Sequence, residues 1–97
     1  MNFSPLTSSQ NYGLPANISA SALIKTGTGT IQGIVVNSHT AGVIKLSDAL
    51  TSTTPLICNT ITLGATERWI PLFGAKFTTG LYLTLVSGTA DLTVVYN

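Results

Sequence analysis

The segment from Thr30 to Asp48 constrains the fold more than any other part of this 97-residue chain. It predicts two β-strands, roughly Thr30–Asn37 and Gly42–Ser47, which form a hairpin around the short loop Ser38–Ala41. Both faces of the first strand carry apolar side chains, a pattern typical of a strand that is covered on both sides. Such a hairpin needs partner strands, and we expect the rest of the chain to supply them.

Alternating apolar residues predict strands along most of the remaining chain, beginning with Ile18–Thr26. The clearest alternation starts at Leu81, and a further strand from Leu92 completes a predicted C-terminal hairpin. Pro71 cannot donate a backbone hydrogen bond, so the predicted strand Glu67–Leu72 ends there or lies on an edge. About seven or eight strands are expected, at spacings of ~8–12 residues. We therefore predict an all-β domain, a single antiparallel β-sandwich or small barrel.

The N-terminal region differs from this pattern. Residues 1–17 have no usable periodicity and contain Pro and Gly among polar residues, which favours an extended N-terminal arm before a β-sandwich domain at residues 18–97. The arm carries the apolar anchors Phe3, Leu6 and Tyr12, and we expect it to pack on its own domain or on a neighbouring subunit. No signal peptide or membrane-spanning run is recognisable.

Scarcity of charge is the most unusual feature of the composition. Only 7% of the residues are charged, against about 25% in a typical soluble domain. Sixteen Thr and nine Ser residues supply polarity instead. The four basic residues are scattered, so we expect no nucleic-acid partner. Low charge suits a subunit that stays packed against others, although a Thr-rich secreted domain also fits.

The residues needed for catalysis or metal binding are few. The chain has one His, one Cys and three carboxylates, so neither a catalytic triad nor a zinc site is predicted. Asp48 and Asp91 lie beside turn signals, where Asp commonly bonds to local backbone. We expect no enzymatic activity, no metal and no cofactor.

Three further residues are candidates for a protein interface. His39 lies in the loop of the first predicted hairpin, where a solvent-facing or capping imidazole is expected. Trp69 fits either the core or an interface, and its neighbour Arg68 forms with it a pair that is frequent at interface hot spots. Together with Phe3, Leu6 and Tyr12, these residues form the predicted interface set.

Two segments of the chain resemble a group of very small tailed-phage virion proteins. They are GIVVNSHTAGVIKLSDA (Gly33–Ala49) and FTTGLYLTLVSGTADLTVVYN (Phe77–Asn97), and they cover somewhat over a third of the chain. Several members of this group look like capsid decoration or cement proteins. Between the two segments, Leu50–Lys76 matches only in its general strand pattern.

The resemblance implies a β-sandwich on the outer surface of a phage capsid, made in the host cytoplasm. It implies a homotrimer that bridges subunits of the major capsid protein against internal DNA pressure, with no membrane contact. Another virion-associated β module is the alternative, such as a tail, neck or fibre component that binds host-surface carbohydrate. The resemblance brings no catalytic residues with it.

Overall fold

A computed structural model describes residues 13–97, and every regular element in this range is a β-strand. All strand pairs are antiparallel and belong to one six-stranded sheet. The strands are β1 (Leu14–Ile18), β2 (Ala22–Thr26), β3 (Gly29–Ser47), β4 (Leu56–Thr62), β5 (Trp69–Phe77) and β6 (Gly80–Tyr96). The prediction of an all-β antiparallel domain is confirmed. Among the described residues, no helix has the length and apolar character needed to cross a membrane.

Two long bent strands replace the two predicted hairpins. β3 has 19 residues and β6 has 17, and they pair antiparallel from Ile31↔Tyr96 to Ser47↔Tyr82. The segment Ser38–Ala41 bends β3 over but does not form a hairpin loop, because its backbone pairs with β6, as in His39↔Ala90, and the two halves of β3 do not pair with each other. The hairpin predictions are therefore wrong, and the described residues form six strands rather than seven or eight.

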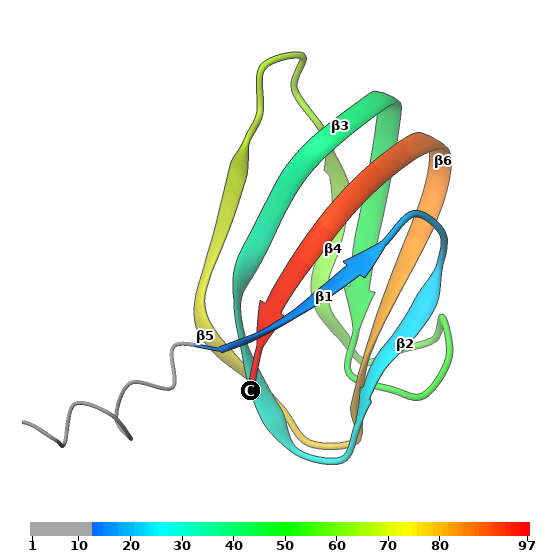
Figure 1. The fold of residues 1–97 in the computed structure, drawn as a ribbon. Coiled ribbons are helices and arrows are strands. Elements are labelled where there is room, and N and C mark those ends of the chain that lie inside the picture. The colour runs from blue at the N-terminus through cyan, green and yellow to red at the C-terminus, as the bar shows by residue number, and fades with distance from the viewer. Residues whose placement is uncertain (1–12) are drawn as a thin grey trace, which may run out of the picture.

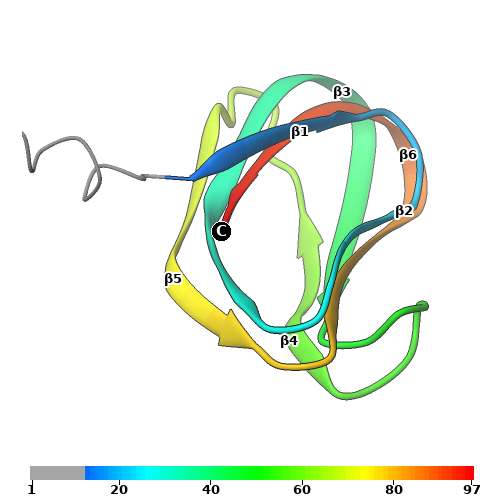
Figure 2. The ribbon, with the colours of Figure 1, turned by 60° about the horizontal axis from the view of Figure 1, so that its bottom comes forward.

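The bend in β3 and β6 folds the sheet over onto itself (Figures 1 and 2). Both strands pass through the bend at irregular positions, where Ala41 has a φ of 50° and Gly88 a φ of 74°. A side chain at Gly88 would collide with the Ala41 carbonyl, so the two strands approach closely there. One half of the folded sheet contains β1 and β5, and the other contains β2 and β4.

The core is made by alternate residues of β3 and β6 together with residues of β5. Ile44 and Leu46 are completely buried, as the alternation in the sequence predicts, and Leu81 and Leu83 are at most 1% exposed. The bend allows one strand to contribute to both halves of the core. The buried cluster comprises Ile31, Ile34, Val36, Ile44, Leu46, Leu63, Ile70, Phe77, Leu81, Leu83, Ala90, Leu92 and Val94.

The predicted boundary between arm and domain differs from the structure. Residues 14–17 belong to β1 and pair with β6, from Leu14↔Tyr96 to Asn17↔Thr93. The predicted strand Ile18–Thr26 is two strands, because residues 19–21 separate β1 from β2. Residues 1–12, which make up the rest of the predicted arm, lie outside the described residues.

β5 lies at an edge of its half of the sheet and pairs with β3 alone. The edge position that Pro71 predicts is confirmed, although the strand continues past Pro71 to Phe77. After Phe77, the turn into β6 is held by Asp48, whose carboxylate accepts backbone bonds from Thr78, Thr79 and Gly80. Asp48 thus bonds to a distant turn rather than to local backbone, contrary to the sequence prediction.

Candidate functional site

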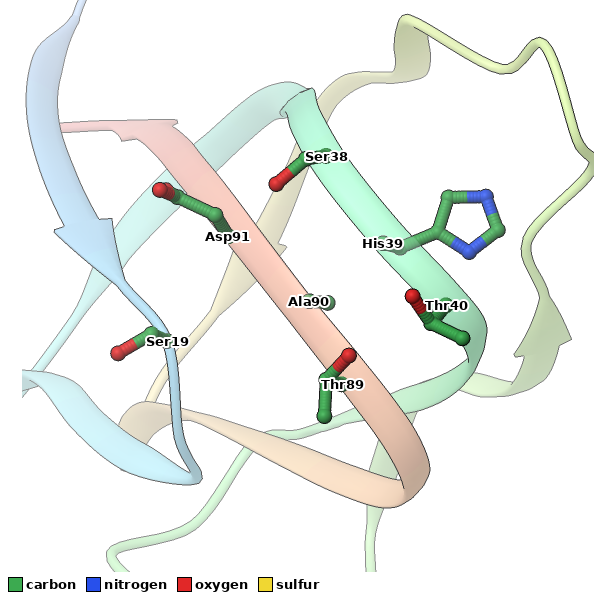
Figure 3. Close-up of a pocket in the computed structure, with 7 residues that line it drawn as sticks. All are labelled: Ser19, Ser38, His39, Thr40, Thr89, Ala90 and Asp91. Atoms are coloured by element: carbon green, nitrogen blue, oxygen red, sulfur yellow. The ribbon is translucent and has the colours of Figure 1, made fainter.

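A polar depression of about 270 Å³ lies where β3 and β6 bend together (Figure 3). Hydroxyl and carboxylate groups from both strands and from the β1–β2 turn surround it. We call it the bend depression, and its lining residues are Ser19, Ser38, His39, Thr40, Thr89, Ala90 and Asp91.

Two asparagine side chains position the carboxylate of Asp91 in the bend depression. Asn17 Nδ2 donates to Asp91 Oδ1 at 2.9 Å, and Asn37 Nδ2 donates to the same oxygen at 3.2 Å. Both amides also donate to Thr93 Oγ1. Asn17 comes from β1 and Asn37 from β3, so residues of two neighbouring strands hold this carboxylate of β6. Asp91 was predicted to bond to local backbone, but its carboxylate bonds to these two distant side chains instead.

His39 is bound to backbone groups on the side of β3 away from Asp91. Its Nδ1 accepts a hydrogen bond from the Gly42 N–H at 3.2 Å, so its proton lies on Nε2, which donates to the Gly64 carbonyl at 2.7 Å. Figure 3 shows the imidazole pointing away from Ser38 and Asp91. The capping role predicted for His39 agrees with this geometry.

The side chains of the bend depression can bind a polar group, but they do not form a nucleophile–base pair. Both imidazole nitrogens of His39 are engaged by backbone, and Asp91 is bonded to Asn17 and Asn37 rather than to His39. Activation of a Ser or Thr hydroxyl needs a base within hydrogen-bond reach. The hydroxyls and the carboxylate instead offer donors and acceptors to a hydroxylated or amide-bearing ligand.

A second feature is an apolar surface on β5, which we call the β5 face and define as Trp69, Pro71 and Phe73. These alternate residues are exposed, whereas Ile70 between them is buried. Trp69 is 45% exposed and Phe73 is 89% exposed. The Trp69 ring lies over Gly33 of β3, where a Cβ would collide with it. Glycine at this position therefore leaves room for the indole against the backbone of β3.

Phe73 has an unusual backbone conformation. Its φ is 55° and that of Gly74 is 74°, so two successive residues are left-handed. The register between β5 and β3 shifts at this point, since Ala75 pairs with Ile31 but Pro71 pairs with Gly33. Phe73 therefore lies in a β-bulge. A left-handed conformation costs a bulky residue roughly 1–3 kcal/mol, so the structure holds the ring outward against a local preference.

Three of the predicted interface residues lie in the described part of the chain. Trp69 and Arg68 are both exposed, which resolves the choice between core and interface left open for Trp69 in favour of the surface. Arg68 lies beside β3, since its carbonyl accepts a bond from the Val36 N–H. The Gly64 carbonyl joins His39 to the loop that leads to Arg68. The other three predicted residues, Phe3, Leu6 and Tyr12, lie outside the described residues.

Sequence reasoning missed Phe73 and the two asparagines. The Phe73–Gly74 pair within a strand pattern is a signal for a bulge, because Gly commonly takes the left-handed position there. The approach of Asn17 and Asn37 to Asp91 had no such signal, since 74 and 54 residues separate the partners.

No protein-family model, curated protein or solved structure matches this chain. Within residues 13–97, no group of three or more His, Cys, Asp or Glu side chains is placed to hold a metal ion. The bend depression and the β5 face are therefore the two features from which a function can be inferred.

Proposed function

We propose that this chain is a phage virion structural protein, a capsid decoration or cement protein that binds the outer head surface and bridges major capsid subunits. The folded-over sheet would act as a compact β-sandwich, assembled as a homotrimer. Residues 1–17, including Phe3, Leu6 and Tyr12, would add contacts with a neighbouring subunit or with the capsid. This role requires a binding surface and no catalysis.

The observation that carries the proposal is the number of large apolar side chains on the surface of a weakly charged chain. Seven such side chains in the described residues are between 37% and 89% exposed: Leu14, Leu23, Leu50, Leu56, Trp69, Phe73 and Val86. Exposed apolar groups are common singly, but two aromatic ones on the same edge strand favour a protein interface. Modest affinity per subunit would suffice, because many copies on one shell act together.

The proposal is tested on purified DNA-filled heads of a tailed phage that encodes this sequence. The chain should be present in numbers comparable with the major capsid protein, as quantitative mass spectrometry would measure. Attachment should also survive about 1 M salt, where the Debye length is only about 3 Å, because few charges are available for the interface. A handful of copies per head would contradict this role, and release in high salt would contradict an apolar, hydrogen-bonded interface.

The bend depression supports a second candidate function, binding of host-surface carbohydrate by a tail, neck or fibre component. Its hydroxyls and the positioned Asp91 carboxylate could bond to sugar hydroxyls. A glycan array probed with the wild-type chain and with Asp91→Ala tests this function. Specific binding that the variant loses would favour it over capsid decoration, and binding that the variant keeps would exclude the bend depression.

A further inference from the structure

We propose that the bend depression binds one ring of a neutral saccharide through the hydroxyl groups of the sugar, and that it excludes acidic sugars. The inference rests on the second candidate function and deepens it, because it specifies which class of carbohydrate the depression accepts. Three properties of the depression support it, namely the layout of its polar side chains, the second carboxylate oxygen of Asp91 and the charge of the lining.

The polar side chains lie as two cross-strand pairs at the centre of the bend. Ser38 on β3 pairs with Asp91 on β6, and Thr40 pairs with Thr89. The register is regular between these two pairs, and residues two apart on a strand project from the same face. The four side chains therefore form one polar array. Side chains opposite each other on neighbouring strands are only ~5 Å apart, so one small ring can contact several of them.

Asp91 presents a carboxylate to this array that is already held in place. Its Oδ1 accepts hydrogen bonds from the amides of Asn17 and Asn37, which occupy both lone pairs of that oxygen. Within residues 13–97, no hydrogen bond reaches its Oδ2. This second oxygen can therefore accept hydrogen bonds from a ligand. A group that is fixed before binding loses little conformational freedom when the ligand arrives.

The array offers both donors and acceptors, as the hydroxyl groups of a sugar do. A carboxylate oxygen only accepts, whereas Ser and Thr hydroxyls both donate and accept. Ser38 is exposed, and Figure 3 shows its hydroxyl pointing toward β6. One sugar hydroxyl can thus donate to Asp91 and accept from Ser38. An ammonium or guanidinium group has no lone pair for the Ser and Thr donors, so a cation matches the array less fully.

The size of the depression suits a single sugar ring. Its volume of about 270 Å³ lies just below the ~300–1,000 Å³ that is usual for small-molecule sites. A longer glycan would extend from the depression into solvent. Monosaccharides are therefore sufficient probes of this site.

The lining carries one negative charge and no positive charge. Asp91 is the acidic residue among the seven that line the depression, and none of the seven is Lys or Arg. The His39 ring is neutral in this arrangement, because its Nδ1 accepts the Gly42 N–H. A sugar carboxylate in the depression would face Asp91 with no cation between them. Such a like-charge contact selects against an acidic ligand.

Matched pairs of sugars test this inference. Methyl glycosides of glucose, galactose and mannose are each compared with the corresponding uronate, in which the primary alcohol is oxidised to a carboxylate. Each is added to the isotope-labelled full chain at low ionic strength, and backbone amide shifts are followed by NMR. We expect a neutral glycoside to shift the amides of Ser38, Thr89 and Asp91. It should bind at least about tenfold more tightly than its uronate, since two like charges about 5 Å apart near a protein surface repel strongly.

Asp91→Asn tests the second oxygen without removing its support. The amide carbonyl can take the place of Oδ1 and still accept from Asn17 and Asn37, while the amide nitrogen replaces Oδ2. We expect this variant to bind the neutral glycoside at least about tenfold more weakly and to lose the discrimination against the uronate. Glu67→Gln removes the same charge outside the depression and should bind as the wild type does. Unchanged emission of Trp69, the single Trp, would show that both variants are folded.

The outcomes separate this inference from the function on which it rests. If only the uronates shift these amides, or if both members of a pair bind equally, the depression still binds carbohydrate and the inference is overturned. Wild-type affinity of Asp91→Asn for the neutral glycoside would overturn it too. If no sugar shifts these amides, the second candidate function fails at this site, and the inference fails with it.

Discussion

Two phenylalanines on the same strand have opposite environments. Phe77 is completely buried in the core cluster, and its ring lies against Gly29 of β3. Phe73, four residues earlier, is 89% exposed and lies in a left-handed bulge. The composition of β5 alone does not distinguish them. The difference shows that one strand can both complete the core and hold an aromatic ring on the surface.

The backbone around each ring explains the contrast. Beyond Phe77, the turn into β6 is fastened by Asp48, whose Oδ1 accepts the Thr79 N–H at 2.8 Å. At Phe73, the register with β3 shifts and no buried contact compensates for the left-handed conformation. Phe77 therefore stabilises the fold, whereas Phe73 costs it stability.

The largest expected effect comes from removing the buried ring. Phe77→Ala should lower the free energy of unfolding by about 3–5 kcal/mol, because it leaves a cavity in the core. Urea denaturation measures this loss, with Val86→Ala as an exposed control expected to change stability by no more than about 0.5 kcal/mol. An equally small loss for Phe77→Ala would remove the contrast between the two rings.

A smaller effect is expected at the turn that follows Phe77. Asp48→Asn should destabilise the protein at neutral pH, because an amide nitrogen in place of Oδ2 cannot accept the bonds that the Thr78 N–H and hydroxyl donate to that oxygen. Glu67→Gln should lose less stability, because the Glu67 carboxylate accepts only a single backbone bond in the structure. Thermal unfolding of both variants ranks the two losses.

The destabilisation at Asp48 should depend on pH. The Thr79 N–H is the main group that holds the pKa of Asp48 below its ordinary value of 3.8; desolvation, the next largest effect, acts in the opposite direction, and the bonds from Thr78 and Gly80 add to the lowering. A lowered pKa contributes stability above the ordinary value, and this contribution is lost as the pH falls through the lower pKa of the folded protein. The difference between wild type and Asp48→Asn should therefore shrink below pH 3.8, as urea midpoints across this range would show. A constant difference would mean that the carboxylate charge is irrelevant to the turn.

The smallest change is expected at Phe73, and it has the opposite sign. Phe73→Asn should raise the free energy of unfolding by about 1 kcal/mol, since Asn adopts the left-handed conformation more readily than Phe. Phe73→Ala should raise the free energy of unfolding by less than Phe73→Asn. Ala keeps the Cβ that disfavours the left-handed conformation and lacks the polar side chain of Asn. Destabilisation by Phe73→Asn in urea would show that the exposed ring supports the fold after all.

The sequence predicted the strands better than their connections. The alternation at Leu81 and Leu83 correctly placed both side chains in the core. The segment Ser38–Ala41, by contrast, has the polar composition of a loop, yet it continues β3 because its backbone pairs with β6. Its partners lie some fifty residues away, so a local pattern could not reveal them.

The residues of the candidate interface likewise divide into those that the sequence predicted and those that it did not. An edge position for Pro71 follows from the residue type alone, because proline cannot take part in a central ladder. The sequence left Trp69 open between the core and an interface, and only the structure places it on the surface. Phe73 escaped prediction, since an aromatic residue between apolar neighbours is typical of a core strand.

By itself, the sequence determined that this chain is antiparallel β and weakly charged, with one His, one Cys and three acidic residues. These properties follow from side-chain period and composition, which are local. The tertiary structure alone decided that β3 and β6 bend rather than turn, and that Phe77 is buried while Phe73 is exposed. Those outcomes depend on which distant backbone groups pair, and long-range pairing is decided by the folded sheet as a whole.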